Sequence, residues 1–158
     1  MKSFFLYLGF ILVLIIVGFL VYPYFLDLSF VFLDKRDVEI FSSSISGRFS
    51  EHLYFATSLG AIPLLYVSTK YFTDLENLKQ KILTYLLIIG GGILSWQLTI
   101  VLLNYRLKRL SEFNIQAGID NTVSIESLDF DAFLPIGYAV GTIVSILIFR
   151  NRKTSLKD

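Results

Sequence analysis

The stretch LLIIGGGILSWQLTIVLLNYRLKRL, residues 86–110, decides the fold class. A helix of about 20 apolar residues crosses the roughly 30 Å hydrocarbon core of a bilayer, and this stretch is long enough. Three other stretches approach the same length without an interior charge. The pattern predicts four transmembrane helices, over residues 4–26, 53–69, 82–103 and 132–149. We therefore expect an all-α integral membrane protein, with the four helices in a bundle that forms a single domain over residues 1–158.

The composition also indicates an apolar environment. Hydrophobic residues make up 54% of the chain and charged residues only 17%, against about 25% charged residues in typical soluble domains. The chain has no cysteine, which excludes disulfides, thiolate nucleophiles and Cys-ligated metal centres. Its net charge of +1 does not indicate a basic surface for nucleic acid. The first predicted span lacks small residues at its end that would form a cleavage site, so we expect a retained anchor.

The distribution of basic residues predicts the orientation in the membrane. Four crossings would place both termini and the loop 70–81 on one side. That side carries Lys2, Lys70, Lys79, Lys81, Arg150, Arg152, Lys153 and Lys157. The outer loops, 27–52 and 105–131, hold fewer basic residues for their length, so the positive-inside rule predicts cytoplasmic termini in the cell membrane. The segment RLKR at 106–109 argues against this orientation, because it would lie outside. A helical extension of the third span into solvent would explain its position, and the reversed orientation is the alternative.

Small residues recur at helical spacing in two of the predicted spans. They are Gly91, Ser95 and Thr99 in the third span and Gly137, Gly141 and Ser145 in the fourth. Such stripes let two helix backbones approach closely in lipid. Ala56 and Gly60 form a weaker stripe in the second span, before Pro63, which is expected to kink that helix. We expect spans two, three and four to pack through these stripes, and a cofactor or lipid niche beside the kink is the alternative.

The third span has a second face, on which Gly90, Gln97 and Asn104 recur every seven residues. A buried amide must be hydrogen-bonded, so Gln97 would bond to Ser or Thr of a neighbouring span or face a partner subunit. Trp96 is expected to fill a gap or face lipid. The candidate helix-packing or partner-binding residues are Gly91, Ser95, Thr99, Gly137, Gly141, Ser145, Gln97 and Asn104.

The sequence predicts no catalytic, cofactor-binding or metal-binding residues. No ionisable residue interrupts the four spans, although transporters and proton relays depend on such residues, and the GxSxG, HExxH, P-loop and GxGxxG motifs are absent. His52, the single histidine, is expected at the membrane interface. A group of acidic residues that matches no calcium loop is expected to be solvated: Asp120, Glu126, Asp129 and Asp131. Asp27 with Asp131 is the pair that an intramembrane hydrolase would need.

The two outer loops alternate polar and apolar residues, a pattern that is typical of short strands. It occurs in residues 36–49, RDVEIFSSSISGRF, and in residues 121–131, NTVSIESLDFD. We expect the two loops to pair into a small β-sheet that caps the bundle, with turns at Gly47 and Gly118, and irregular loops are the alternative. Residues 25–34, FLDLSFVFLD, would instead lie along the membrane interface.

These expectations favour a non-enzymatic membrane protein that acts as a structural or accessory subunit. Its partners would be the lipid bilayer and other membrane protein subunits, bound through the helix faces and outer loops in a homo- or hetero-oligomer, with no nucleic acid. One alternative is a small oligomeric channel or transporter, lined by Thr99, Gln97 and Asn104. Two others are an immunity-type membrane protein that occupies a toxin's helices, and a membrane hydrolase that uses loop carboxylates.

Overall fold

The computed structural model describes residues 2–34, 38–41, 45–73, 75, 77–117 and 122–150. The described chain is mostly helical, as the sequence predicts. Its elements are α1 (Lys2–Val31), β1 (Glu39–Phe41), α2 (Ile45–Gly60), α3 (Ile62–Phe72), α4 (Leu78–Ala117), β2 (Thr122–Ser124), the 3-10 helix η1 (Ile125–Ser127) and α5 (Leu134–Arg150). Because α2 and α3 follow one another with a single residue between them, the described chain forms four helical rods.

The break between α2 and α3 lies beside Pro63, where the sequence predicts a kink. Ala61 keeps helical φ and ψ angles of −75° and −20°, and its amide donates to the Thr57 carbonyl at 3.0 Å. Pro63 has no amide hydrogen to give to the preceding turn, which interrupts the helical hydrogen bonds at this point. The rod is longer than predicted, because α2 begins at Ile45 rather than near residue 53.

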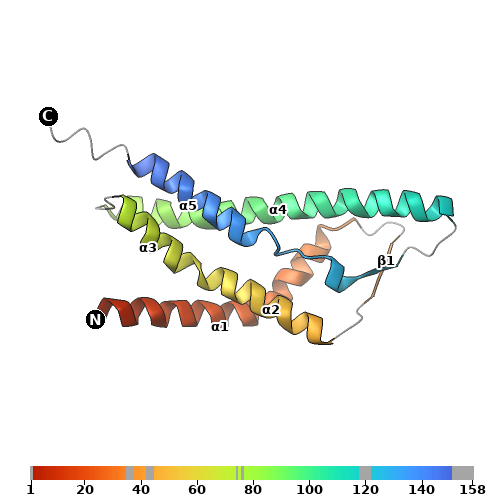
Figure 1. Ribbon diagram of the computed structural model, residues 1–158, viewed down its shortest axis with the longest axis horizontal. Coiled ribbons are helices and arrows are strands. Elements are labelled where there is room, and N and C mark those ends of the chain that lie inside the picture. Colours follow the sequence, from red (N-terminus) through yellow and green to blue (C-terminus); the bar gives the residue numbers. More distant parts are fainter. Residues whose placement is uncertain are drawn as a thin grey trace.

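α4 runs along the whole molecule, and α5 lies antiparallel against its first half (Figure 1). α1 packs against α2, and α3 contacts both α4 and α5. The start of α1, the connection from α3 to α4 and the end of α5 lie together at one end, which we call the terminal end. The two strands and η1 lie toward the other end, which we call the sheet end. This is the end-to-end arrangement that four crossings would require.

α1 extends beyond its predicted end near residue 26 and reaches Val31. Pro23 lies inside the helix, and Figure 1 shows the last part of α1 turning away from the first part toward α4. A proline inside a helix removes one hydrogen bond and favours such a bend. After the bend, the rings of Phe25 and Phe32 lie 5.7 and 5.8 Å from that of Trp96 on α4, measured between centroids.

The predicted pairing of the two outer loops is confirmed. β1 and β2 form a parallel two-stranded sheet, in the register Glu39 to Thr122, Ile40 to Val123 and Phe41 to Ser124. Each strand has only three residues, fewer than the alternating patterns suggested. The predicted turn at Gly47 is wrong because Gly47 belongs to α2, and Gly118 lies outside the described residues.

The predicted outer loops, 27–52 and 105–131, are too long. Residues 27–31 belong to α1, residues 45–52 belong to α2, and α4 continues through the RLKR segment to Ala117. The loss of hydropathy after residue 103 did not mark the end of a helix, because Arg and Lys are good helix formers. The predicted helical extension at this segment is therefore confirmed.

Two hydrophobic clusters hold the elements together. The first joins helices along the bundle and includes Tyr22, Phe55, Ile62, Tyr66, Ile88, Leu134 and Tyr138. The second lies at the sheet end and contains Leu33, Ile100, Leu103, Leu107, Leu128 and Phe130. Val38, Ile40 and Val123 pack against the second cluster, so the small sheet covers apolar side chains of α4 and of the segment before α5.

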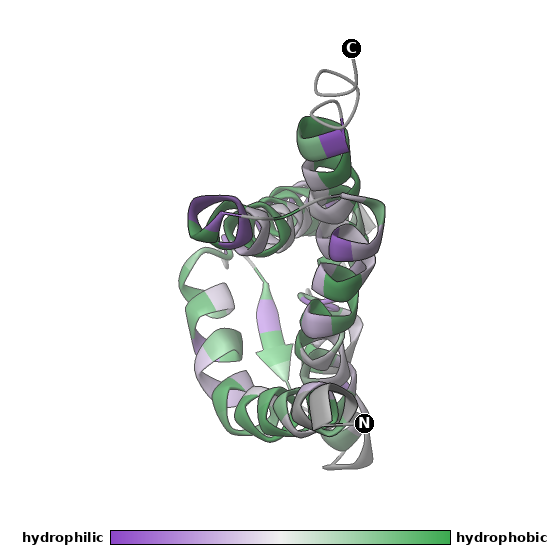
Figure 2. Cartoon of the chain, turned by 90° about the vertical axis from the view of Figure 1, so that its left-hand side faces the viewer, coloured by the Kyte–Doolittle hydropathy of each residue, from purple (hydrophilic) through white to green (hydrophobic). Residues whose placement is uncertain are grey.

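Two helices are long and apolar enough to cross a membrane, by length and composition alone. They are Tyr7–Val31, with a mean hydropathy of 2.5, and Leu78–Asn114, with a mean hydropathy of 2.1. Much of their apolar surface faces outward, and Figure 2 shows hydrophobic residues on the outer as well as the inner sides of the helices. On α1, Leu12, Ile16 and Leu20 are 53%, 60% and 66% exposed.

Candidate functional site

α4 and α5 touch through their glycines. A Cβ atom at Gly91 would collide with the backbone carbonyl oxygen of Gly137, and a Cβ at Gly137 would collide with that of Gly91. One turn further along, a Cβ at Gly141 would collide with the carbonyl oxygen of Leu87. The predicted stripe residues of the two helices thus face one another across this contact, where the backbones leave no room for a side chain.

Hydroxyl groups continue the same contact in both directions. Toward the terminal end, Ser145 of α5 donates to the hydroxyl of Thr84 on α4 at 3.2 Å, and both residues are fully buried. Toward the sheet end, the Ser95 hydroxyl donates to the backbone carbonyl of Phe133. Thr99 is buried and donates to the Ser95 carbonyl one turn earlier, at 3.0 Å. Polar atoms in this contact are therefore bonded within the protein.

The stripe of Ala56 and Gly60 packs against a different helix from the one expected. A Cβ at Gly18 of α1 would lie 2.8 Å from the Cα of Ala56, and a Cβ at Gly60 would lie 2.5 Å from a side-chain carbon of Ile15. The prediction that this stripe packs span two against spans three and four is wrong, since the stripe packs α2 against α1. Sequence reasoning missed Gly18 because no small residue repeats at helical spacing beside it.

Trp96 and Asn104 fasten the end of α1 to α4. The indole Nε1 of Trp96 donates to the Ser29 hydroxyl at 3.0 Å. The Asn104 side chain accepts a hydrogen bond from the Asp34 amide at 2.8 Å and donates one to the Phe32 carbonyl at 3.2 Å. Helix ends leave carbonyls without intrahelical partners, and Asn104 supplies one of these partners from the neighbouring helix. Trp96 thus fills the space between the end of α1 and α4, which was one of the two expectations for it.

Gln97 and Gly90 differ from Asn104 in their surroundings. Gln97 is exposed and lines an open pocket of about 310 Å³ with Phe32 and Trp96. A Cβ at Gly90 would meet nothing within 4 Å. The second face predicted for the third span is therefore divided: Asn104 contacts α1 internally, whereas Gln97 and Gly90 lie on the outer surface of α4.

An acidic pocket lies at the sheet end, between α2 and the segment that leads into α5. It has a volume of about 360 Å³, and its lining residues are Ser50, Glu51, Tyr54, Asp129, Asp131 and Ala132. Two phenols hold its walls in place. The Tyr22 hydroxyl donates to the Glu51 carboxylate at 2.8 Å, and the Tyr54 hydroxyl donates to the Ala132 carbonyl at 3.2 Å. The pocket thus brings three carboxylates together from two distant parts of the chain.

Asp131 is the buried carboxylate of this acidic pocket. Its side chain is only 4% exposed, and its Oδ2 atom has no hydrogen-bond partner among the described residues. The pKa of Asp131 is raised to about 6, chiefly by burial; a hydrogen bond from its own backbone lowers the pKa, and the charges of Glu51 and Asp129 contribute to the rise. The expectation of a solvated carboxylate is wrong for Asp131. Of its predicted companions, Asp120 and the side chain of Glu126 lie outside the described residues.

The structure does not bring Asp27 and Asp131 into one pocket, and the described residues include no group of metal ligands. Asp27 is exposed on α1 and is not among the residues that line the acidic pocket with Asp131. His52 lies close to two rings, with centroid distances of 4.3 Å to Tyr22 and 5.2 Å to Phe19. Across the described ranges, no three His, Asp or Glu side chains are placed to hold one metal ion.

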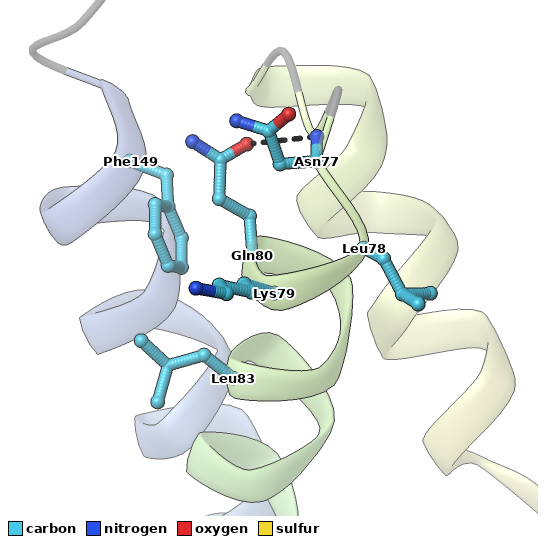
Figure 3. A pocket seen from close by; sticks show the side chains of 6 residues that line it. All are labelled: Asn77, Leu78, Lys79, Gln80, Leu83 and Phe149. Atoms are coloured by element: carbon cyan, nitrogen blue, oxygen red, sulfur yellow. Dashed lines mark hydrogen bonds between the residues drawn. The ribbon is translucent and has the colours of Figure 1, made fainter.

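A second pocket, of about 590 Å³, opens at the terminal end, where α4 begins (Figure 3). Phe149 enters it from α5, and its other lining residues are Asn77, Leu78, Lys79, Gln80 and Leu83. The Gln80 side chain accepts a hydrogen bond from the Asn77 amide at 3.4 Å, as in the reciprocal half of a capping box. This pocket lies at the start of α4, and none of its described lining residues has a buried side-chain polar atom without a partner.

Comparison of the chain with family models, with curated proteins and with solved structures found no match. Function must therefore be inferred from the residues themselves. Besides Gly18, sequence reasoning missed the two residues of α2 in the acidic pocket, Glu51 and Tyr54. Their spacing of three places them on one face of a helix, but the sequence carries no signal that this face meets Asp131.

Proposed function

We propose that the chain is a multi-pass protein of the cytoplasmic membrane that acts as a non-enzymatic structural or accessory subunit. Its terminal end would face the cytoplasm and its sheet end the opposite side. The observation that carries the proposal is the surface of α1. Only 11% of the most apolar window of Tyr7–Val31 is buried.

Apolar surface of this kind is costly in water. Exposing apolar surface to water costs roughly 25 cal/mol of free energy per Å² relative to burying it. The large side chains that α1 exposes include Phe10, Leu12, Ile16 and Leu20. These side chains occur on several sides of the helix, with no charge among residues 4–26. A bilayer, or the helices of another membrane protein, would remove this surface from water.

The hydroxyl groups of the bundle support a structural role over conduction. Thr69 donates to the Leu65 carbonyl at 3.1 Å, and Thr142 donates to the Tyr138 carbonyl at 2.8 Å. Both threonines are buried and satisfy their hydroxyls within their own helices. Between the helices, these buried hydroxyls are already hydrogen-bonded and the neighbouring side chains are apolar, which suits helix packing better than a path for ions or polar solutes.

Gln97 is the residue that we propose to contact a partner subunit. It is exposed near the middle of α4, next to Leu94, Leu98 and Val101, which are also exposed. In an apolar environment, an amide without a partner costs several kcal/mol by the larger estimates. Interhelical hydrogen bonds from Gln stabilise helix association in lipid by about 0.6–2 kcal/mol. A helix of a second subunit, seated on this face, would supply the partner.

The orientation can be tested by labelling single cysteines, since the native chain has none. A membrane-impermeant maleimide applied to intact cells is expected to label Ser127→Cys at the sheet end. It should label Asn77→Cys at the terminal end only after permeabilisation. Ile16→Cys should resist labelling in both conditions because lipid would surround it. Labelling of Ile16→Cys at the rate of Ser127→Cys would rule out insertion of α1.

The subunit role can be tested by measuring mass after extraction in a mild detergent. We expect a stable oligomer or a complex with a second membrane protein, and we expect Gln97→Leu to weaken it by about 1 kcal/mol. Leu110→Val, an exposed change on the same helix more than three turns from Gln97, is the matched control. A protein that is strictly monomeric, with nothing co-purifying, would contradict the role.

A further inference from the structure

We propose that the acidic pocket at the sheet end binds a guanidinium or primary ammonium group. The pocket combines Glu51 of α2 with Asp129 and Asp131 of the segment before α5, and the described residues that line it include no basic side chain. Three carboxylates around a single open pocket attract a positively charged group. The proposal rests on this pocket alone and holds whether or not the helices span a membrane.

The unpaired oxygen of Asp131 is the observation that points to a ligand. This side chain is 4% exposed, and its Oδ2 atom has no hydrogen-bond partner in the described part of the chain. Buried carboxylate oxygens are nearly always hydrogen-bonded, because an isolated buried charge is very costly. Asp131 is itself one of the lining residues, so a cation in the pocket would lie beside the carboxyl group whose Oδ2 atom lacks a partner.

The spacing of the carboxylates favours an organic cation over a metal ion. In the part of the chain that is described, no three acidic or histidine side chains converge on a single point, as a metal ion would require. The volume of about 360 Å³ suits a flat guanidinium with five N–H donors or an ammonium with three. Such donors bridge carboxylates that lie several ångströms apart, and charge assistance strengthens each hydrogen bond.

The rest of the pocket matches the same chemistry. Tyr54 donates its hydroxyl to the Ala132 carbonyl, which fixes an aromatic ring in the wall, and aromatic rings favour neighbouring cations. The Glu51 carboxylate is held by the Tyr22 hydroxyl, so its position does not depend on a ligand. The cation would come either from an arginine or lysine of a partner protein or from a free small amine.

The binding test uses the purified full-length protein in detergent and isothermal titration calorimetry. The probes are agmatine, the peptide acetyl-Gly-Arg-Gly-amide and the same peptide with neutral citrulline in place of arginine. We expect at least one guanidinium probe to bind and the citrulline peptide not to bind. Tighter binding of the peptide identifies a partner's side chain as the source, and tighter binding of agmatine identifies a free amine.

The variants locate the binding. Asp131→Asn and Glu51→Gln are each expected to weaken binding at least tenfold, whereas Asp27→Asn, which removes an exposed carboxylate of α1, should leave it unchanged. A thermal midpoint for Asp131→Asn at or above that of the native protein shows that the variant is folded.

Three results would overturn the proposal. They are equal binding of the citrulline peptide, unchanged affinity in folded Asp131→Asn, and tighter binding of Ca²⁺ at the same carboxylates. None of these results bears on the orientation or the mass of the protein, so the two proposals fail independently.

Discussion

The backbone carbonyl of Gly91 occupies the space that a Cβ on Gly137 would need, and the Gly137 carbonyl occupies the space that a Cβ on Gly91 would need. This reciprocal contact sets how closely α4 and α5 approach. The same two helices also share the hydrogen bond from Ser145 to Thr84. Any side chain at either glycine must push the helices apart along this whole contact.

The three consecutive glycines of α4 provide a matched test of this contact. We expect Gly91→Ala to destabilise the protein by about 1–3 kcal/mol, the usual cost of overpacking, because the new methyl group meets backbone atoms that cannot move alone. Gly90→Ala meets nothing within 4 Å and should stabilise α4 by up to about 1 kcal/mol through helix propensity. Thermal unfolding in detergent measures both changes, and equal midpoints for the two variants would contradict the contact.

The packing of α1 on α2 can be tested with two glycines of α1. We expect Gly18→Ala to lower the thermal midpoint, because the added methyl group would lie 2.8 Å from the Cα of Ala56. The cost should again be about 1–3 kcal/mol. Gly9→Ala meets nothing within 4 Å and serves as the control. A destabilising Gly9→Ala with a neutral Gly18→Ala would mean that α1 contacts α2 through another face.

Asn104 should hold the end of α1 on α4. Asn104→Ala removes its two hydrogen bonds, to the Asp34 amide and the Phe32 carbonyl, and each is worth about 0.5–1.5 kcal/mol. We expect faster amide hydrogen exchange around residues 31–34 and a lower thermal midpoint. Asn114→Ala, on the same helix and without a described hydrogen bond, should change neither. Unchanged exchange in Asn104→Ala would show that these bonds do not hold the segment.

Asp131 should make stability depend on pH. Its pKa is about 6 in the folded protein, against an ordinary value of 3.8, so the folded state holds the proton more tightly. The stability contribution of Asp131 is full below about pH 4, falls as pH rises through about 6, and stays low above it. This difference corresponds to about 3 kcal/mol at most.

Asp131→Asn removes that dependence. The variant should match the native protein near pH 4 and melt at a higher temperature at pH 7. Glu51, Asp129 and Tyr54 line the same pocket, and Tyr22 donates to Glu51. All four are present in both proteins, so the difference in stability between the two proteins reports Asp131. Asp27→Asn is the control, and a native protein that gains stability relative to Asp131→Asn on going from pH 4 to pH 7 would contradict the burial of this carboxylate.

The helices and their closest contact could be predicted from the sequence, because both depend on local patterns. The recurrence of Gly137, Gly141 and Ser145 every four residues describes a surface of one helix, and the same spacing in α4 describes the surface that receives it. Pro63 likewise predicts the break between α2 and α3, because proline has no amide hydrogen to donate within the helix. In each case the signal and the structural consequence lie within a few residues of each other.

The acidic pocket could not be predicted in the same way. Asp131 looks like any carboxylate that follows a span, and only the path of α2 places Glu51 and Tyr54 beside it. The contact at Gly18 could not be predicted, because a single glycine in an apolar segment does not form a pattern of small residues at helical spacing. The ends of α1 and α4 were missed because hydropathy reports the environment of a helix rather than its length.

The parallel pairing of β1 with β2 has a consequence for the order of biosynthesis. β1 emerges from the ribosome shortly after α1, but its partner strand follows only after α2, α3 and α4 have been translated. Closing so long a loop costs entropy before the strands can compensate for it. The cap over the second cluster is therefore a late event, which the nascent chain completes only once most of its helices exist.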